Sequence, residues 1–201
     1  MANEHHPQLA LITGDLITGI HDSIPNCLDE LRRLKTDAGV FGCMGNHEGY
    51  LGAEAYTASE AARRGFQFLR RQQAALQFGT ARLNLAGVDH QWRKETYLRG
   101  ADGLVRPGEL NILLSHNPDV FPAAAKQGWA VTFSGHMHGG QINLELGRAN
   151  LNFMQLVTPY VRGLYTAGQS SIYVSRGIGT VGMPARIGAA PEVGIIRLRR
   201  A

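Results

Sequence analysis

Four short apolar runs along the chain each end in a polar cluster. The runs cover residues 9–13, 40–44, 110–114 and 130–134, and the clusters that follow are Gly14-Asp15, Gly45-Asn46-His47-Glu48, Ser115-His116 and Gly135-His136-Met137-His138. Apolar runs of this length are typical of strands that are buried on both faces. Because function collects where the strands of layered sheets end, the pattern predicts a site that is assembled from these loops.

Stretches of helical pattern separate the strands. One helix is expected from Ser23, a cap residue that Pro25 follows, with Gly39 beyond its end; two more are expected over Ala53–Arg64 and Val120–Lys126. Further strands are expected at 66–69, 83–87, 172–175 and 193–198, the last of which would complete a sheet. Interleaved helices and strands predict the α/β class, with enough strands for two sheets.

Length and composition fit one globular domain over residues 1–201, because 44% of the chain is hydrophobic and both signs of charge are mixed. The net charge of +4 is scattered, which argues against a nucleic-acid binder and suits an anionic substrate. The polar segment 1–8 has no signal-peptide pattern, and no apolar run approaches the roughly 18 residues of a membrane span. With Cys27 and Cys43 interpreted as free thiols, a cytoplasmic protein is expected.

The clusters carry oxygen and imidazole donors of the kind that bind transition metals. The donors are Asp15, Asn46, His116, His136 and His138, and this mixture suits Mn, Fe, Zn, Co or Ni rather than calcium. Taken singly, each is weak evidence, since Gly14-Asp15 is usually a turn and a lone histidine is usually a core residue. The ordered set, in which each member closes an apolar strand, is what favours a metal site.

The order GD, GNHE, SH and GHMHGG resembles the calcineurin-like metallophosphoesterases, over essentially the whole chain. The segments Tyr173–Gly179 and Pro191–Val193 look like the bacterial branch of small phosphodiesterases, which are related to membrane-associated phosphohydrolases. The resemblance implies a four-layer sandwich, with two mixed β-sheets flanked by helices, and a two-metal site. It further implies hydrolysis of phosphate esters, diesters above monoesters, by a metal-bound hydroxide, with manganese as the first choice of ion.

Carried over by resemblance, the motif residues take specific roles. Asp15 would bridge two metals, Asn46, His116 and His136 would complete the second metal's ligands, and His138 would bind the first metal. His47 would lie beside the substrate as the catalytic acid or transition-state stabiliser, and Asn46 would also contact the substrate. His90 ends another strand, where the family often carries an acidic pair, and is assigned to the substrate side.

Several further residues have two interpretations each. Glu48 either supports the ligands or is a solvated loop carboxylate. Asn117 and Asp119 are assigned to a turn before Pro118 rather than to catalysis. Three arginines have two possible roles: they contact phosphate, or they lie at the surface or in buried ion pairs. The second role is the commoner one, and the three are Arg162, Arg176 and Arg186.

The chain departs from the family pattern at its start. The Asp-x-His that normally supplies two ligands of the first metal occurs nowhere, and Thr18 stands where an acidic residue is common. Only fourteen residues precede Asp15, so the opening strand is expected to be missing and the edge of segment 9–13 to recruit a second copy, giving a homo-oligomer. Peripheral membrane association stays open.

Three explanations of this departure compete. The enzyme works with an altered first metal position, or His5 and His6 replace the missing ligands, or the chain is a mononuclear or inactive metal-binding scaffold that acts as an interaction protein. Hydrolysis is favoured because the other chemical motifs are intact.

Overall fold

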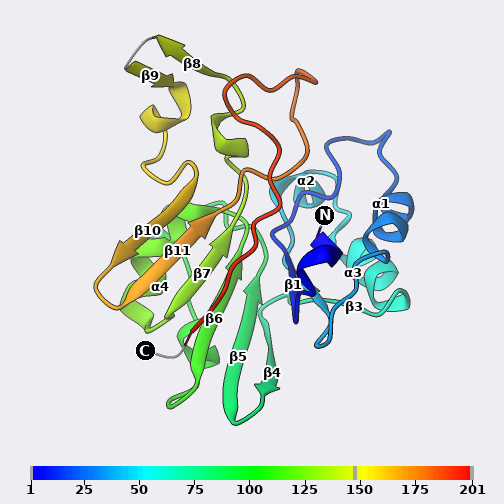
Figure 1. Ribbon diagram of the computed structural model, residues 1–201, viewed down its shortest axis with the longest axis vertical. Helices are drawn as coiled ribbons and strands as arrows, with labels where there is room; N and C mark the ends of the chain where they lie inside the picture. Colours follow the sequence, from blue (N-terminus) through cyan, green and yellow to red (C-terminus); the bar gives the residue numbers. More distant parts are fainter. Residues whose placement is uncertain (1, 147–148, 200–201) are drawn as a thin grey trace.

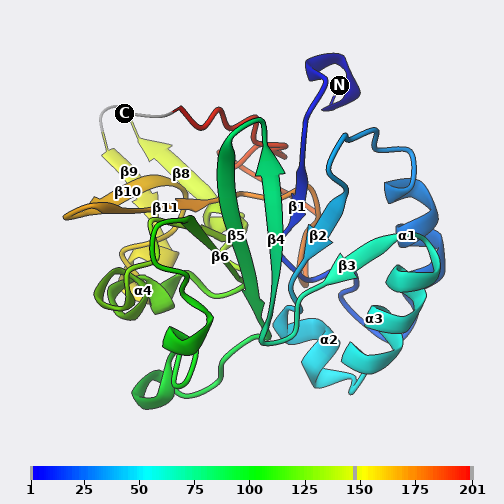
Figure 2. The same ribbon diagram turned by 90° about the horizontal axis from the view of Figure 1, so that it is seen from below.

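A computed structural model describes residues 2–146 and 149–199. Two β-sheets pack face to face, with helices against their outer faces, and form a four-layer α/β sandwich (Figures 1 and 2). This is the predicted fold class. A separate two-stranded ribbon, β8 (Asn143–Leu146) with β9 (Ala149–Asn152), stands apart from both sheets.

The small sheet has three parallel strands in the order β1-β2-β3. They are β1 (Ala10–Ile12), β2 (Val40–Gly42) and β3 (Phe66–Phe68). Helices α1 (Ile24–Leu31) and α3 (Glu54–Arg63) lie on its outer face, and the short α2 (Asn46–Tyr50) follows β2. The expected cap is present, since the Ser23 side chain accepts a hydrogen bond from the Asn26 amide at the start of α1.

The large sheet has six strands in the order β10-β11-β7-β6-β5-β4. The strands are β4 (Gln72–Phe78), β5 (Ala81–Val88), β6 (Leu110–Ser115), β7 (Val131–Ser134), β10 (Gly163–Ala167) and β11 (Ser170–Val174). The four inner strands run parallel, and the edge strands β4 and β10 are antiparallel to their neighbours. Helix α4 (Phe121–Gln127) packs against β11.

Alternation along the buried strands divides the core into layers. Val40 packs with α1 and α3, whereas the next residue, Phe41, packs between the two sheets against Leu85 and Leu114. On the far side of the large sheet, Leu113 packs with Trp129, which is fully buried. The continuous apolar runs therefore do serve two faces, as the sequence predicts.

One expected strand is absent and several were not expected. Segment 193–198 forms no strand, and Val193, Ile195, Ile196 and Leu198 are 44–56% exposed. It cannot pair with β11, because β7 and β10 occupy both edges of that strand. Strands β4, β8, β9 and β10 were missed, as was the helix α2, since the Asn46 loop was interpreted as a strand end without helix.

Helices of the described residues are too short and too polar for any of them to cross a bilayer. The 3₁₀ turns lie in the connections and at the amino end; they are Ala2–His5, Lys94–Thr96, Asp102–Leu104, Pro118–Val120, His138–Gly140 and Phe153–Leu156.

Candidate metal and active site

Three neighbouring parallel strands of the large sheet each present a histidine just beyond their carboxyl ends. His90 follows β5, His116 follows β6 and His136 follows β7, and these strands pair with Val88 opposite Ser115 and Leu114 opposite Phe133. The small sheet adds Asp15 after β1 and Asn46 after β2. Parallel strands bring their carboxyl ends to one edge, so residues more than 100 positions apart meet there.

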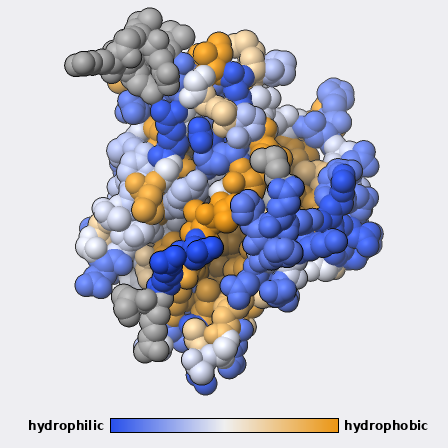
Figure 3. Space-filling model, viewed as in Figure 1, coloured by the Kyte–Doolittle hydropathy of each residue, from blue (hydrophilic) through white to orange (hydrophobic). Residues whose placement is uncertain are grey.

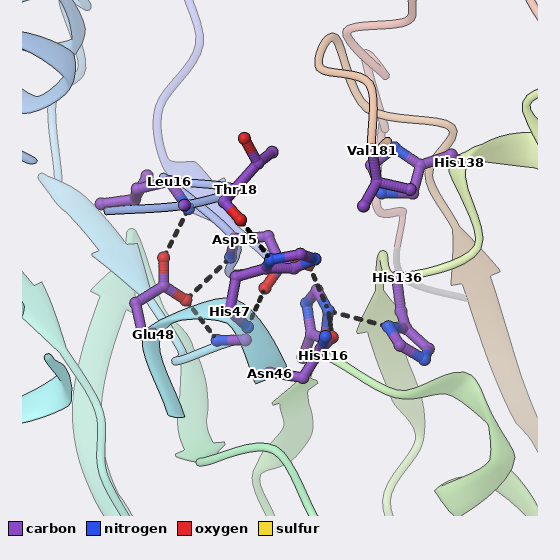
Figure 4. A network of polar contacts seen from close by, with 12 residues as sticks. Asp15, Leu16, Thr18, Asn46, His47, Glu48, His116, His136, His138 and Val181 are labelled. Carbon is purple, nitrogen blue, oxygen red and sulfur yellow. Dashed lines mark hydrogen bonds and ion pairs between the residues drawn. The ribbon is translucent and has the colours of Figure 1, made fainter. Parts of the chain in front are cut away.

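Four ligand-type atoms lie close together, and the central one is Nε2 of His116, which is buried. Its Nε2 lies 3.0 Å from Asp15 Oδ2, 3.0 Å from Asn46 Oδ1 and 3.1 Å from His136 Nδ1 (Figure 4). Its Nδ1 lies 2.6 Å from the Thr13 carbonyl oxygen, which can only accept, so Nδ1 carries the hydrogen. Nε2 is therefore the ring atom that faces Asp15 Oδ2, Asn46 Oδ1 and His136 Nδ1. One proton could bridge a single pair of these atoms, whereas a divalent cation would satisfy all four.

The loops that hold these donors approach each other through backbone rather than side chains. A Cβ on Gly14 would lie 2.6 Å from the Gly45 backbone nitrogen, so a larger residue would push the two loops apart. Asp15, His136 and His138 adopt the left-handed region, with φ of 55°, 69° and 49°. Non-glycine residues are uncommon there and persist where the surroundings impose the conformation, often at functional sites.

Glu48 joins the two loops of the small sheet. Its carboxylate is fully buried and accepts hydrogen bonds from three backbone amides, those of Gly45 (2.8 Å), Asp15 (3.0 Å) and Leu16 (2.6 Å). Of the two interpretations of Glu48, the structure therefore supports the positioning role rather than a solvated loop. Burial could not be inferred from the residue type, because Glu is mostly exposed.

His47 is held by a chain of hydrogen bonds that begins at Asp22. The Asp22 carboxylate accepts from the Thr18 amide, the Thr18 hydroxyl and the Gly19 amide, and it fixes this loop. The Thr18 carbonyl accepts in turn from His47 Nδ1 at 2.9 Å, which leaves Nε2 facing Asp15 Oδ2 at 4.0 Å. Thr18, which departs from the family pattern in its side chain, thus positions the imidazole through its backbone.

Burial governs the protonation of the cluster. It lowers the pKa of His136 to about 3, with the nearby His116 and His90 rings adding to the effect, and it lowers the pKa of His90 to about 4. Burial alone would raise the pKa of Asp15, but hydrogen bonds from His116 and His47 hold it below its ordinary value. Neutral imidazoles and an ionised carboxylate are the forms that bind a metal ion.

His138 stands apart from the convergence point. Its ring lies beside Val181, away from His116 and His136 (Figure 4), and the Arg186 guanidinium approaches its Nδ1 to 3.5 Å. Arg186 also donates to the His138 carbonyl at 3.1 Å and so holds this loop. The pKa of His138 is lowered, chiefly by burial. The structure thus brings together Asp15, Asn46, His116 and His136 but leaves His138 outside their cluster.

His5 and His6, the proposed replacement ligands, lie at the wrong end of the small sheet. Both are exposed and precede β1, whereas Asp15 follows it. The turn that contains His5 is tied to the loop before β2 by Asn3, which bonds to Arg33 and Lys35. Figure 2 shows the amino terminus and α2 at opposite ends of the molecule. Replacement of the missing ligands by these histidines is therefore wrong for this structure.

The three arginines of the carboxyl-terminal third have structural roles, which was the commoner of the two roles considered for them. Arg176 pairs with Glu192 at 2.6 Å, Arg186 donates to backbone carbonyls, and Arg162 donates to the Gly188 carbonyl.

Asn117 exchanges two hydrogen bonds with the Gln91 backbone and so fixes the segment after β5, in addition to the turn role assigned to it.

A hollow of about 340 Å³ opens next to His90 and was not predicted from the sequence. It is lined by Arg71, His90, Gln91, Trp92, Arg93, Thr96 and Arg99, with no acidic side chain among them. Trp92 packs edge-on against His90 at 4.5 Å, and Tyr50 lies 4.8 Å from Trp92. Two exposed aromatic residues close to the ligand motifs were the signal that could have indicated this wall.

Comparisons with known proteins agree with this geometry. Residues 1–140 match the family model described as calcineurin-like phosphoesterase. The chain is 29% identical to the metallophosphoesterase YkuE of Bacillus subtilis, across 98% of this chain and 70% of that protein. It is 28% identical to phosphodiesterase YaeI of Escherichia coli, across 97% and 72%. It is also 27% identical to a transmembrane protein with a metallophosphoesterase domain from Danio rerio, across all of this chain and 48% of that protein.

Proposed function

Because the chain belongs to the calcineurin-like phosphoesterase family, we propose that it hydrolyses phosphate esters, diesters in preference to monoesters, with a divalent transition-metal ion. Asp15, Asn46, His116 and His136 hold the ion in this proposal, and His47 acts on the substrate. Manganese is the first ion to test, since the mixture of carboxylate, amide oxygen and imidazole suits it. The name of the relative YaeI supports the diester assignment.

The observation that carries the proposal is the meeting of four ligand-type atoms, since Asp15 Oδ2, Asn46 Oδ1 and His136 Nδ1 each lie about 3 Å from His116 Nε2. Such a cluster repels itself unless a cation or a proton lies within it. When bound, a divalent ion in such a site lowers the pKa of a water molecule and stabilises charge on a phosphoryl group.

His47 supplies the proton in this proposal. Its Nδ1 hydrogen is committed to the Thr18 carbonyl, so the proton that can be transferred is the one on Nε2 of the imidazolium. Nε2 borders the cluster, where a phosphate oxygen or a departing alkoxide would lie within reach. Protonation of the leaving oxygen, or hydrogen bonding to the phosphoryl oxygen, is the role that this placement supports.

The hollow beside His90 supports a substrate with a second ester group. Arg71, Arg93 and Arg99 give it a positive field, and Trp92 gives it an apolar wall. A monoester would leave this surface unused, whereas the second group of a diester would extend into it. His90 borders the cluster on this side, and Asn46 is a member of the cluster; both are proposed substrate contacts besides His47.

The proposed stoichiometry is one tightly held ion per chain. The cluster has four ligands for it, while the first position of the family keeps His138, which lies apart, and shares Asp15. Cytoplasmic location, a single domain over residues 1–201 and assembly into a homo-oligomer remain parts of the same proposal. Peripheral membrane association is supported by the name of the Danio rerio relative alone.

The test measures metal content and turnover together. Purified protein is stripped with a chelator, reloaded with Mn²⁺, and assayed with bis-(p-nitrophenyl) phosphate and with the corresponding monoester. We expect about one ion per chain, hydrolysis of the diester that depends on added metal, and slower hydrolysis of the monoester. Binding of metal without turnover over several ions would favour the inactive scaffold instead.

A further inference from the structure

His90 is a third imidazole at the cluster, and no motif of the family assigns it to a metal. Ring nitrogens of His90, His116 and His136 lie within 4.8 Å of one another. The His90 ring centroid is 5.3 Å from that of His136 and 5.7 Å from that of His116. In the part of the chain that the structure describes, these three histidines are the group of three or more histidines, cysteines or acidic residues that lies close enough together to hold one ion.

The His90 ring is held in place but its Nδ1 is not satisfied. Asn117 bonds twice to the backbone of Gln91, and Trp92 packs against the imidazole at 4.5 Å. Nδ1 is buried, yet within the described part of the chain it has no hydrogen-bond partner. A buried polar atom without a partner costs free energy, and such cases in native structures call for an explanation such as a missing ion or water.

The neighbouring acidic residue does not provide that partner. Asp89 is engaged by Arg70, whose Nε and Nη2 donate to both carboxylate oxygens at 2.9–3.2 Å. The ion pair occupies the Asp89 carboxylate, whereas the His90 ring lies next to the rings of His116 and His136. The sheet order places His90, His116 and His136 on three adjacent strands, which gives the three rings one common edge.

We propose that His90 is an additional ligand of the ion held by Asp15, Asn46, His116 and His136. The inference rests on the proposed function only in requiring that this site binds a metal. Two imidazole nitrogens about 2.1 Å from one ion are at most about 4.2 Å apart, so His90 needs to move by less than about 1 Å to join.

The experiment measures metal binding directly. Metal-free wild-type protein and the variants His90→Ala, His90→Asp and Trp92→Ala are titrated with Co²⁺, and the visible absorption of the bound ion is recorded with the affinity. Asp can replace imidazole as a ligand, and Trp92 touches His90 without offering a ligand atom. Circular dichroism and thermal unfolding of the metal-free proteins check that each variant folds.

We expect His90→Ala to weaken Co²⁺ binding about tenfold or more and to shift the absorption bands, because a lost metal contact costs at least as much as a lost supporting contact. His90→Asp should recover part of the affinity, and Trp92→Ala, which keeps the ligand atom, should change the affinity and the spectrum less than His90→Ala does. An unchanged spectrum and affinity in His90→Ala would overturn the proposal, and a raised KM for the diester in that variant would leave His90 as a substrate contact alone. A wild-type protein that binds no Co²⁺ would instead refute the metal site itself.

Discussion

The Glu48 carboxylate lies 3.0 Å from the backbone amide of Asp15, 33 positions earlier in the chain, and also accepts from the amides of Gly45 and Leu16. This single side chain ties the loop after β1 to the loop after β2. Because Asp15 and Asn46 sit in these two loops, Glu48 sets the distance between a carboxylate and an amide donor without touching either side chain. The geometry of the site therefore depends on a residue that is not one of the proposed metal ligands.

Replacing Glu48 with alanine should destabilise the protein and loosen the metal site. Three backbone amides would lose a charged acceptor. The buried hydrogen bond from Gly45 is worth about 1.5–3 kcal/mol, and the two partly buried ones from Asp15 and Leu16 add to it, so a loss of at least about 2 kcal/mol in the free energy of unfolding is expected. Denaturant unfolding of metal-free protein measures it. Glu30→Ala, which removes an exposed pair with Arg33, is the control and should cost less than about 1 kcal/mol. Similar losses in both variants would show that the Glu48 hydrogen bonds contribute little.

His47→Ala should keep the metal and lose the chemistry. His47 lies 4.0 Å from Asp15 Oδ2 but is not one of the four atoms that converge at His116. We expect unchanged Mn²⁺ content and a fall in kcat of about a hundredfold or more, the usual scale for a lost general acid. Tyr50→Ala, which removes a ring that packs against His47, controls for altered packing. Loss of metal from His47→Ala would assign it to the ligands.

Arg93→Ala and Arg99→Ala should weaken substrate binding more than turnover. Both side chains line the hollow beside His90 and, among the described residues, neither forms an ion pair. We expect KM for a diester to rise several-fold with kcat nearly unchanged, the pattern of a lost uniform binding interaction, and added salt to reduce the difference. Arg82→Ala, an exposed arginine at the opposite end of β5, is the control. Identical KM values in all four proteins would place the second ester group elsewhere.

The sequence predicted the parts of the fold that depend on local pattern. Residues such as Phe41 and Leu113 sit in apolar runs because their strands are buried on both faces, and those strands were located correctly. Parallel pairing then explains why residues that end separate strands, such as Asp15 and His116, meet at one edge. Each of the four apolar runs therefore predicted both a strand and the place, just beyond its end, of a candidate metal ligand.

The features that depend on distant contacts could not be predicted. Strand β4 packs Ala74, Leu76 and Phe78 on the core between the sheets, but its three glutamines and Ala75 weaken the apolar signal along the sequence. Segment 193–198 alternates like a strand, but the sheet has no free edge for it beside β11. The burial of Glu48 and the wall formed by Trp92 likewise arise from packing between segments far apart in the sequence.

Association through the edge of β1 should make the protein a dimer or higher oligomer. Within the described residues, β1 pairs with β2 alone, and Leu9, Leu11, Leu76 and Phe78 are half-buried around the core between the sheets. Figure 3 shows apolar side chains in a hollow on the face where β1 lies. Unpaired strand edges recruit other strands. Light scattering well above micromolar concentration should show an oligomer that Leu11→Pro disrupts, and a wild-type monomer under these conditions would contradict the prediction.

The two histidines of the GHMH motif should differ in their importance. His136 Nδ1 lies 3.1 Å from His116 Nε2 within the cluster, whereas His138 lies apart beside Arg186. His136→Ala should therefore lose most of its bound metal and activity, because it removes one of four ligands. His138→Ala should retain about one ion per chain and part of the activity. Metal analysis after gel filtration and a diester assay measure both.

The pair provides its own control for misfolding. Both histidines lie in the loop after β7, both occupy the left-handed backbone region, and both substitutions remove the same ring. A general effect on folding should thus appear in both variants, whereas a difference in metal content points to the ligand role of His136. Equal and complete losses in both would mean that the first metal position is functional. Its other ligands would then have to come from solvent or from a partner chain, because His5 and His6 lie at the opposite end of the small sheet.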